Sequence, residues 1–114
     1  MVKNHEQLFL HFGPGPNWEK PSSDWLSIDC DLNRGDIICD FNEFQSLPLE
    51  DDSVKGVYAS HFCEHVSIYK SDLLFSECAR VMETGGVFRI VIPNVRVSIE
   101  EYMKGNKDFL LFKR

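Results

Sequence analysis

The chain has 114 residues, of which 43% are hydrophobic and 26% are charged, and its formal net charge at pH 7 is -6. This length suits one domain with one modest core, so we expect a single domain over residues 1–114. An acidic chain without a clustered basic patch argues against nucleic-acid binding. The sequence contains no run of about 18 apolar residues and no signal-peptide pattern, so we expect no association with a membrane.

The cysteines indicate a reducing compartment. The four of them stand at positions 30, 39, 63 and 78, and no two form a CxxC pair. Such scattered residues are typical of reduced thiols rather than of a disulfide framework. We therefore expect a cytoplasmic protein.

Five short apolar runs predict buried β-strands. They span residues 8–12, 25–29, 36–40, 54–60 and 86–92. The runs are often continuous rather than alternating, which is typical of parallel strands covered on both faces. The run at 86–92 is the strongest because it is rich in β-branched residues.

Two helices are expected in the second half of the chain. The first spans residues 71–82, and Gly85-Gly86 provides a suitable stop. The apolar residues on its shared face are Leu74, Cys78, Val81 and Met82. The second helix is expected to start near Ser98. Strands that alternate with helices favour βαβ units and a parallel sheet.

Glycine or polar residues follow every predicted strand. In chain order they are Gly13-Pro14-Gly15, Asp29, Asp40-Phe41-Asn42, Ser60-His61 and Pro93-Asn94. In an open parallel sheet, ligands bind outside the carboxyl ends of the strands. Glycine lets the backbone approach a ligand, and a carboxylate can accept both hydroxyl protons of a ribose. Each feature alone is more often a turn or a cap, but the ordered series predicts a ligand crevice.

Four segments in order resemble a known family. They read LHFGPG, DWLSID, CDFNEFQSLPLEDDSVKGVYASHFCEHV and ECARVMETGGVFRIVIPN, within about residues 8–103. Together they resemble the class I S-adenosylmethionine-dependent methyltransferases, in particular the small type 11-like group. The resemblance implies an α/β fold with a Rossmann-like open, mostly parallel sheet in strand order 3-2-1-4-5. It implies helices on both faces, and the short chain would lack the full C-terminal antiparallel strand pair.

The resemblance also implies a cofactor, S-adenosylmethionine, with S-adenosylhomocysteine as the product. The cofactor-binding residues carried over are Gly13, Pro14, Gly15, Asp29, Asp40, Phe41, Ser60 and His61. The glycine loop would let the backbone pass the methionine part, and the aspartate after the second strand would hold the ribose hydroxyls. The Asp-Phe pair would face the adenine edge, and the Ser-His pair would lie near the sulfonium.

Two departures from the family pattern stand out. Lys55 occupies a position where the family usually has aspartate, which we interpret as a surface change. After the fifth strand, residues 108–112 could supply one sixth strand but not a full pair. The fifth strand would then lie near an edge of the sheet, where it could pair with a second chain, so a homodimer is expected.

Methyl transfer is an in-line displacement in which the protein supplies positioning and sometimes a base. His61, and after it His65, are the candidate catalytic residues, because histidine exchanges protons near neutral pH. A structural role for either histidine stays open. We expect methyl transfer to an oxygen or nitrogen of a small molecule, such as a sugar or metabolite. The alternative is a non-catalytic module that binds S-adenosylmethionine or S-adenosylhomocysteine and needs a partner chain.

A less favoured alternative is a metal-dependent hydrolase. His61, Glu64 and His65 form an HxxEH stretch, which resembles an inverted zinc-peptidase signature, and His11 could be a third ligand. Such a motif needs a long helix, whereas this one begins where a strand is predicted to end. We therefore expect no metal site.

Overall fold

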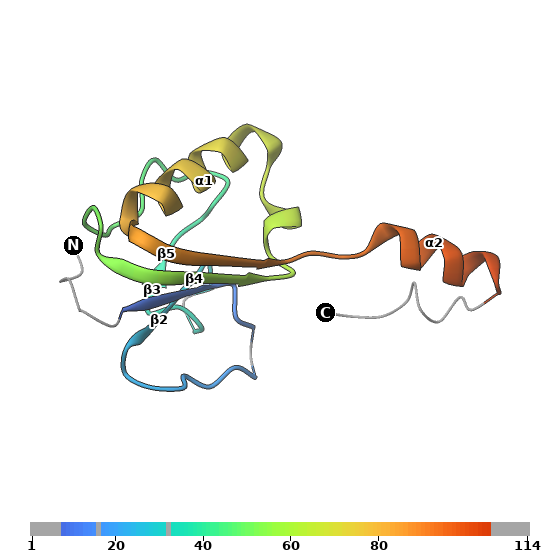
Figure 1. The fold of residues 1–114 in the computed structure, drawn as a ribbon, viewed down its shortest axis with the longest axis horizontal. Coiled ribbons are helices and arrows are strands. Elements are labelled where there is room, and N and C mark those ends of the chain that lie inside the picture. Colours follow the sequence, from blue (N-terminus) through green and yellow to red (C-terminus); the bar gives the residue numbers. More distant parts are fainter. Residues whose placement is uncertain (1–7, 16, 32, 106–114) are drawn as a thin grey trace.

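The computed structural model describes residues 8–15, 17–31 and 33–105. Its strands are β1 (Phe9–Phe12), β2 (Trp25–Asp29), β3 (Ile37–Ile38), β4 (Val54–Ser60) and β5 (Met82–Val91). Its helices are the one-turn 3₁₀ helix η1 (Cys63–His65), α1 (Ile68–Val81) and α2 (Val95–Met103). The strands form one parallel sheet in the order β3-β2-β1-β4-β5 (Figure 1). The predicted Rossmann-like α/β fold and its strand order are confirmed.

Helix α1 covers one face of this sheet. Its apolar stripe buries Leu74, Cys78 and Val81, and Phe75 contacts Phe88 of β5 at 5.9 Å between ring centroids. The stripe recurs at helical spacing, which is why this segment folds as an amphipathic helix. The main hydrophobic core therefore lies between α1 and the sheet.

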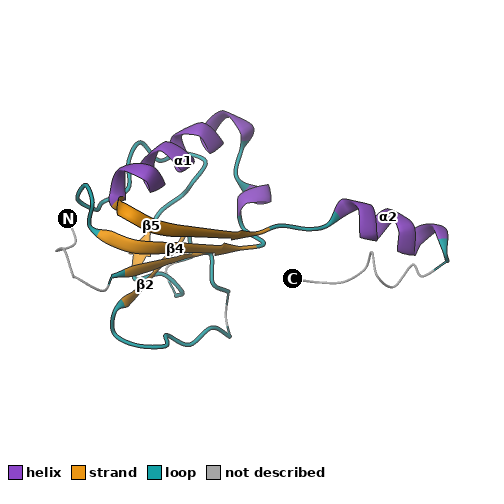
Figure 2. Ribbon diagram, in the orientation of Figure 1, coloured by secondary structure: helices purple, strands orange, loops and turns teal. Residues whose placement is uncertain are grey.

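The opposite face is arranged differently from the prediction of helices on both faces. Within the described ranges no helix covers it, and Trp18 from the β1–β2 connection packs against His11 instead. That connection contains Pro14 and Pro21, and proline disfavours a regular helix interior. Helix α2 covers neither face, because it projects beyond the carboxyl ends of the strands (Figure 2). We call the face opposite α1 the open face.

Helix boundaries differ from the prediction because of capping. Helix α1 starts three residues earlier than expected, since the Ser67 side chain accepts a hydrogen bond from the Tyr69 N–H at 3.2 Å. Helix α2 starts at Val95 rather than near Ser98, because the Asn94 side chain accepts from the Val97 N–H at 3.2 Å. Both caps satisfy backbone donors that have no partner inside the helix.

Strand boundaries differ as well. Strand β5 begins at Met82, so Gly85-Gly86 does not end the helix but lies inside the strand, where the pairing with β4 is irregular. Gly85 has φ +86°, a conformation that favours glycine. Strand β3 is only two residues long and forms one edge of the sheet. The expected sixth strand at 108–112 lies outside the described residues.

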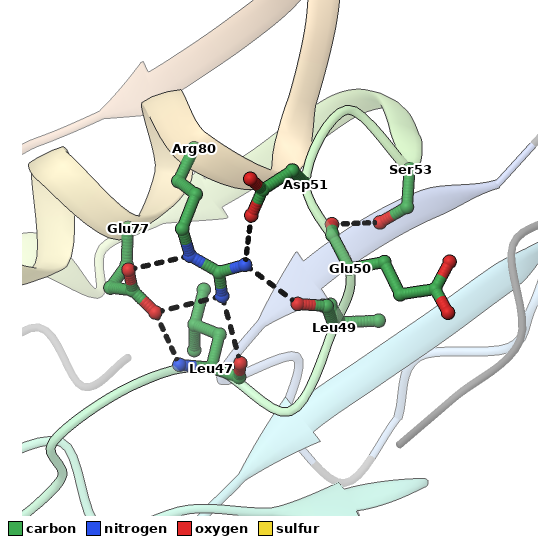
Figure 3. Close-up of polar contacts among 7 residues, drawn as sticks. All are labelled: Leu47, Leu49, Glu50, Asp51, Ser53, Glu77 and Arg80. Atoms are coloured by element: carbon green, nitrogen blue, oxygen red, sulfur yellow. Dashed lines mark hydrogen bonds and ion pairs between the residues drawn. The ribbon is translucent and has the colours of Figure 1, made fainter.

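The loop between β3 and β4 is anchored on α1. Arg80 donates hydrogen bonds to the carbonyl oxygens of Leu47 at 3.0 Å and Leu49 at 2.9 Å, and it contacts Asp51 at 2.8 Å (Figure 3). These bonds hold the loop against the helix. None of the described helices is long and apolar enough to cross a membrane.

Candidate functional site

A cavity of the described structure lies at the carboxyl ends of the strands, where β1 and β4 lie side by side. The strand order reverses direction between these two neighbours, which is the switch point where ligands bind in open α/β sheets. The cavity has a volume of about 710 Å³. This size lies within the range of small-molecule sites.

All nine residues predicted for the site line this cavity. They are Gly13, Pro14, Gly15, Asp29, Asp40, Phe41, Ser60, His61 and His65. The fold therefore brings together segments that are up to about fifty positions apart in the chain. Asn42, which belongs to the predicted series of strand-end residues, also lines the cavity. The sequence reasoning did not name the other lining residues, which are Cys30, Arg34, Phe62 and Val66. Cys30, Phe62 and Val66 each directly follow a predicted site residue in the chain, whereas Arg34 has no such neighbour.

The glycine loop is held close to the end of β4. The Gly13 N–H donates to the Ile28 carbonyl at 2.8 Å, and Gly13 has φ +57°. A Cβ at this position would lie 2.7 Å from Cδ1 of Phe62, closer than carbon atoms can approach. Gly15 has φ +82°, but a Cβ there would meet open space. Gly13 is thus required by both backbone conformation and packing, and Gly15 by conformation alone.

Asp29 lies at the end of β2 and is buried at the cavity wall. Its backbone carbonyl accepts a hydrogen bond from the Cys39 N–H at 2.9 Å, and its Oδ1 accepts from the Asp31 N–H at 3.0 Å. These contacts fix the orientation of the carboxylate. A carboxylate has about four acceptor positions, so Asp29 keeps capacity for hydroxyl groups of a ligand.

The loop after β3 is positioned by two consecutive hydrogen bonds. Asp40 Oδ1 accepts from the Asn42 N–H at 3.0 Å, and Asn42 Oδ1 accepts from the Ser67 N–H at 2.8 Å at the start of α1. Phe41 is buried and packs against Phe62, with ring centroids 4.8 Å apart. The aromatic contact supports the cavity floor, and the Asp40 side chain forms part of its wall.

His61 combines a strained backbone with an unsatisfied ring nitrogen. It has φ +51°, and its backbone N–H donates to the Val91 carbonyl at 2.7 Å. Its Nδ1 is buried without a hydrogen-bond partner among the described residues. Glu64 Oε2 lies 3.7 Å from that atom and 3.8 Å from Nε2 of His65. Strain and unsatisfied polar atoms cluster at functional sites, so this residue has the features expected of one.

The geometry does not support the metal-dependent hydrolase. His61 precedes the single turn η1, so it and His65 do not share one face of a long helix. His11 is buried on the open face, with ring centroids 4.5 Å from Trp18 and 4.9 Å from Tyr58. In the part of the chain that the structure describes, no three metal-ligating side chains come together. The HxxEH stretch thus lies at a strand end and in a single turn rather than in a long helix.

All four cysteines are free thiols, as predicted. Cys39 and Cys78 are buried, and burial raises the pKa of Cys78 to about 12. Burial also raises the pKa of Cys39 and of Cys63. Cys30 differs from these three because it is exposed and lines the cavity beside Asp29.

Comparison with known proteins agrees with this arrangement. The sequence profile of the family described as "Methyltransferase domain" matches residues 28–90. The matched segment runs from β2 to β5 and contains most of the cavity lining. No curated protein and no solved structure matched the chain. Because the profile covers more than half of the 114 residues, and the strand order is that of the Rossmann-like methyltransferase fold, the chain belongs to the class I S-adenosylmethionine-dependent methyltransferase family.

Proposed function

We propose that this chain binds S-adenosylmethionine in the strand-end cavity and transfers its methyl group to an oxygen or nitrogen of a small molecule. The observation that carries the proposal is the convergence of nine predicted residues, from four strand ends, on one cavity of about 710 Å³. Family membership supports methyl transfer in general. The acceptor class rests on the small cavity and on the acidic charge of the chain.

The residues present suit this cofactor. Gly13 and Gly15 have no side chains, so main-chain atoms at these two positions can meet the methionine part of the ligand. The fixed carboxylate of Asp29 is an acceptor for the two ribose hydroxyls. Asp40 and the main chain of Phe41 lie beside it on the cavity wall, where they would face the adenine edge. The apolar side chains of Phe62 and Val66 line another part of the cavity.

When bound, S-adenosylmethionine supplies the electrophilic methyl group. The protein then has to hold the acceptor in line with the sulfonium and to accept the acceptor's proton. His61 suits the second task, because it lines the cavity next to Ser60. Since its Nδ1 is buried toward Glu64, Nε2 is the ring nitrogen that would take the proton. His65 lines the same wall and is the second candidate.

The compartment proposed for this reaction is the cytoplasm. The four free thiols support it, because disulfides are rare where glutathione keeps thiols reduced.

Calorimetric titration of the purified protein with S-adenosylmethionine and with S-adenosylhomocysteine tests the cofactor. We expect dissociation constants in the micromolar range, on the order of -8 kcal/mol. Asp29→Asn keeps an acceptor for the Asp31 N–H but loses the charge, and it should weaken binding at least about tenfold. Asp24→Asn is a matched control, because Asp24 precedes the same strand at its other end. A folded protein that binds neither compound overturns the proposal.

The catalytic half needs a separate measurement. Release of S-adenosylhomocysteine should be followed against a panel of sugars and small metabolites that carry hydroxyl or amino groups. We expect turnover with at least one acceptor, and we expect His61→Ala to lower turnover by a larger factor than it lowers cofactor affinity. Cofactor binding without turnover on any acceptor would instead support the non-catalytic module.

A further inference from the structure

A second concave surface lies on the open face of the sheet, away from the cofactor cavity. It has a volume of about 400 Å³ and is lined mainly by Phe9, Trp25, Lys55, Tyr58, Val87 and Arg89. We call it the open-face groove. Phe9 and Trp25 are the first residues of β1 and β2, and Val87 pairs with Gly56 near the start of β4. The groove therefore lies over the amino-terminal half of the strands, at the opposite end from the cofactor cavity.

In the described part of the sheet, β5 is an edge strand with one unpaired side. It is the last strand in the sheet order, and its partner is β4 alone among the described strands. The Val91 carbonyl accepts from the His61 N–H next to β4, so the alternate residues Phe88 and Ile90 turn their backbone groups outward. The Val87 side chain is 66% exposed and that of Ile90 is 41% exposed. A long apolar edge of this kind is a template for pairing with another chain.

Helix α2 carries an apolar stripe that the described part of the chain leaves exposed. Val95, Ile99, Tyr102 and Met103 recur at helical spacing, and each is at least half exposed. The helix follows β5 through residues 92–94 and projects beyond the carboxyl ends of the strands (Figures 1 and 2). It thus points away from the groove of its own chain.

We propose that a second copy of this chain pairs with β5 and that each α2 lies in the open-face groove of the other copy. Two identical edges related by a two-fold axis across the sheet run antiparallel. The carboxyl end of one β5 then lies beside the amino end of the other. Helix α2 extends from the carboxyl end, and the groove lies near the amino end, so the pairing brings the two surfaces together. Three separate features, the open edge, the stripe and the groove, are covered by one arrangement.

Charge supports this occupant. The chain as a whole is acidic, with a net charge of -6, yet Lys55 and Arg89 both line the groove. Helix α2 carries Glu100 and Glu101. Glu100 pairs with Arg96 at 3.2 Å and Glu101 pairs with Lys104 at 3.8 Å, but exposed pairs of this kind contribute little and can exchange partners. In this arrangement, Lys55 binds an acidic side chain of α2 from the other copy.

The dimer is expected to be of moderate strength. A nine-residue helix is short, but the two-fold arrangement buries two helices, two grooves and two strand edges. Such an interface falls near the lower limit of stable ones, about 1,200 Å² in total. We therefore expect a dissociation constant in the micromolar range, on the order of -8 kcal/mol.

Sedimentation velocity over about 1 to 200 µM protein tests the proposal, since this range brackets the expected constant. We expect a concentration-dependent dimer, and Ile99→Asp should weaken it at least about tenfold because it places a charge in the apolar stripe. Tyr69→Asp is the matched control, because Tyr69 is 90% exposed on α1 and should leave the dimer unchanged. Circular dichroism checks that each variant is folded. A monomer at every concentration, or a dimer that Ile99→Asp leaves intact, overturns the proposal.

Zero-length cross-linking, which joins amines to carboxylates, then identifies the contact. We expect a bond from Lys55 to Glu100 or Glu101 in the dimer fraction and not in the monomer fraction. The same bond in the monomer would show that α2 folds back onto its own groove, which contradicts the exchange. Neither experiment requires the cofactor, so this proposal and the proposed function fail or succeed separately.

Discussion

Arg80 donates two hydrogen bonds to the carboxylate of Glu77, which lies about one helical turn earlier on α1. Its Nε donates to Oε2 at 2.7 Å, and its Nη2 donates to Oε1 at 2.9 Å (Figure 3). Glu77 Oε1 also accepts from the Leu47 N–H at 2.7 Å. Arg80 thereby holds the pKa of the buried Glu77 carboxyl below its usual value. The pair joins α1 to the loop before β4, and so to the strand that His61 directly follows.

Replacing Arg80 should therefore cost stability. Arg80→Ala removes the opposite charge from the buried Glu77 carboxylate and the donor from two loop carbonyls, and we expect a loss of about 2–4 kcal/mol in the free energy of unfolding. Arg80→Lys keeps the charge but loses the planar fork, so it should lose about half as much. Urea denaturation measures both. Arg96→Ala removes an exposed pair on α2 and should change stability by about 0.5 kcal/mol or less. Equal losses of stability in Arg80→Ala and Arg96→Ala would contradict this role of Arg80.

Acidification should weaken the fold through His11. Burial among Trp18, Trp25 and Tyr58 lowers the pKa of this histidine below 6.5. The folded state thus favours the neutral ring. The contribution of His11 to the free energy of unfolding is therefore present above pH 6.5 and is lost as the pH falls through the lowered pKa.

Urea denaturation followed by tryptophan fluorescence between pH 7.5 and pH 5.5, a window about the unperturbed pKa of histidine, tests this. His11→Phe should flatten the pH dependence, whereas His65→Gln, at an exposed position, should keep it. A wild-type stability that does not fall over this range would refute the assignment.

The two glycines after β1 should differ in their tolerance of alanine. Gly13→Ala meets both a positive φ and the ring of Phe62 at 2.7 Å, whereas Gly15→Ala meets only the positive φ. We expect about 1 kcal/mol loss of stability for Gly15→Ala and at least about 2–3 kcal/mol for Gly13→Ala. Cofactor affinity should fall further in Gly13→Ala, because the displaced Phe62 lines the cavity. Thermal unfolding and calorimetry give both quantities, and the reverse ranking would be inconsistent with this packing.

Alkylation of Cys30 should report on ligand binding. Burial raises the pKa of Cys39, Cys63 and Cys78, so these thiols stay protonated and react slowly, while Cys30 is exposed at the cavity. We expect iodoacetamide to modify Cys30 first, and saturating S-adenosylhomocysteine to slow this reaction at least about fivefold by covering the thiol. Peptide mass spectrometry assigns the site. Labelling of Cys30 at an unchanged rate would place the ligand elsewhere.

Much of the site was predictable because its determinants are local in the chain. Apolar runs of five to seven residues mark β2 and β4 with the bounds that the structure shows. In a parallel sheet the residues after such runs must gather at one edge, which is why Asp29 and His61 could be assigned to one cavity before any coordinates. Gly13 follows from the same logic.

Other features depended on contacts between distant segments. Phe62 looks like an ordinary apolar residue, and only the approach of two loops makes it the neighbour that forbids a side chain at Gly13. The sequence did not place Glu77 on the apolar face of its helix. It is nevertheless buried, because Arg80 and the Leu47 N–H satisfy its carboxylate. His11, a possible metal ligand by sequence, lies on the opposite face from the cavity.

The sequence by itself therefore determined the strands, their order by family resemblance, and the residues at the strand ends, since periodicity and backbone preference act over a few residues. The tertiary structure decided which side chains meet across the chain and which face of the sheet stays open. These outcomes depend on packing and on the pairing of buried polar groups, whose partners lie up to about thirty residues away. Such energies belong to pairs of residues, and local sequence patterns carry no record of them.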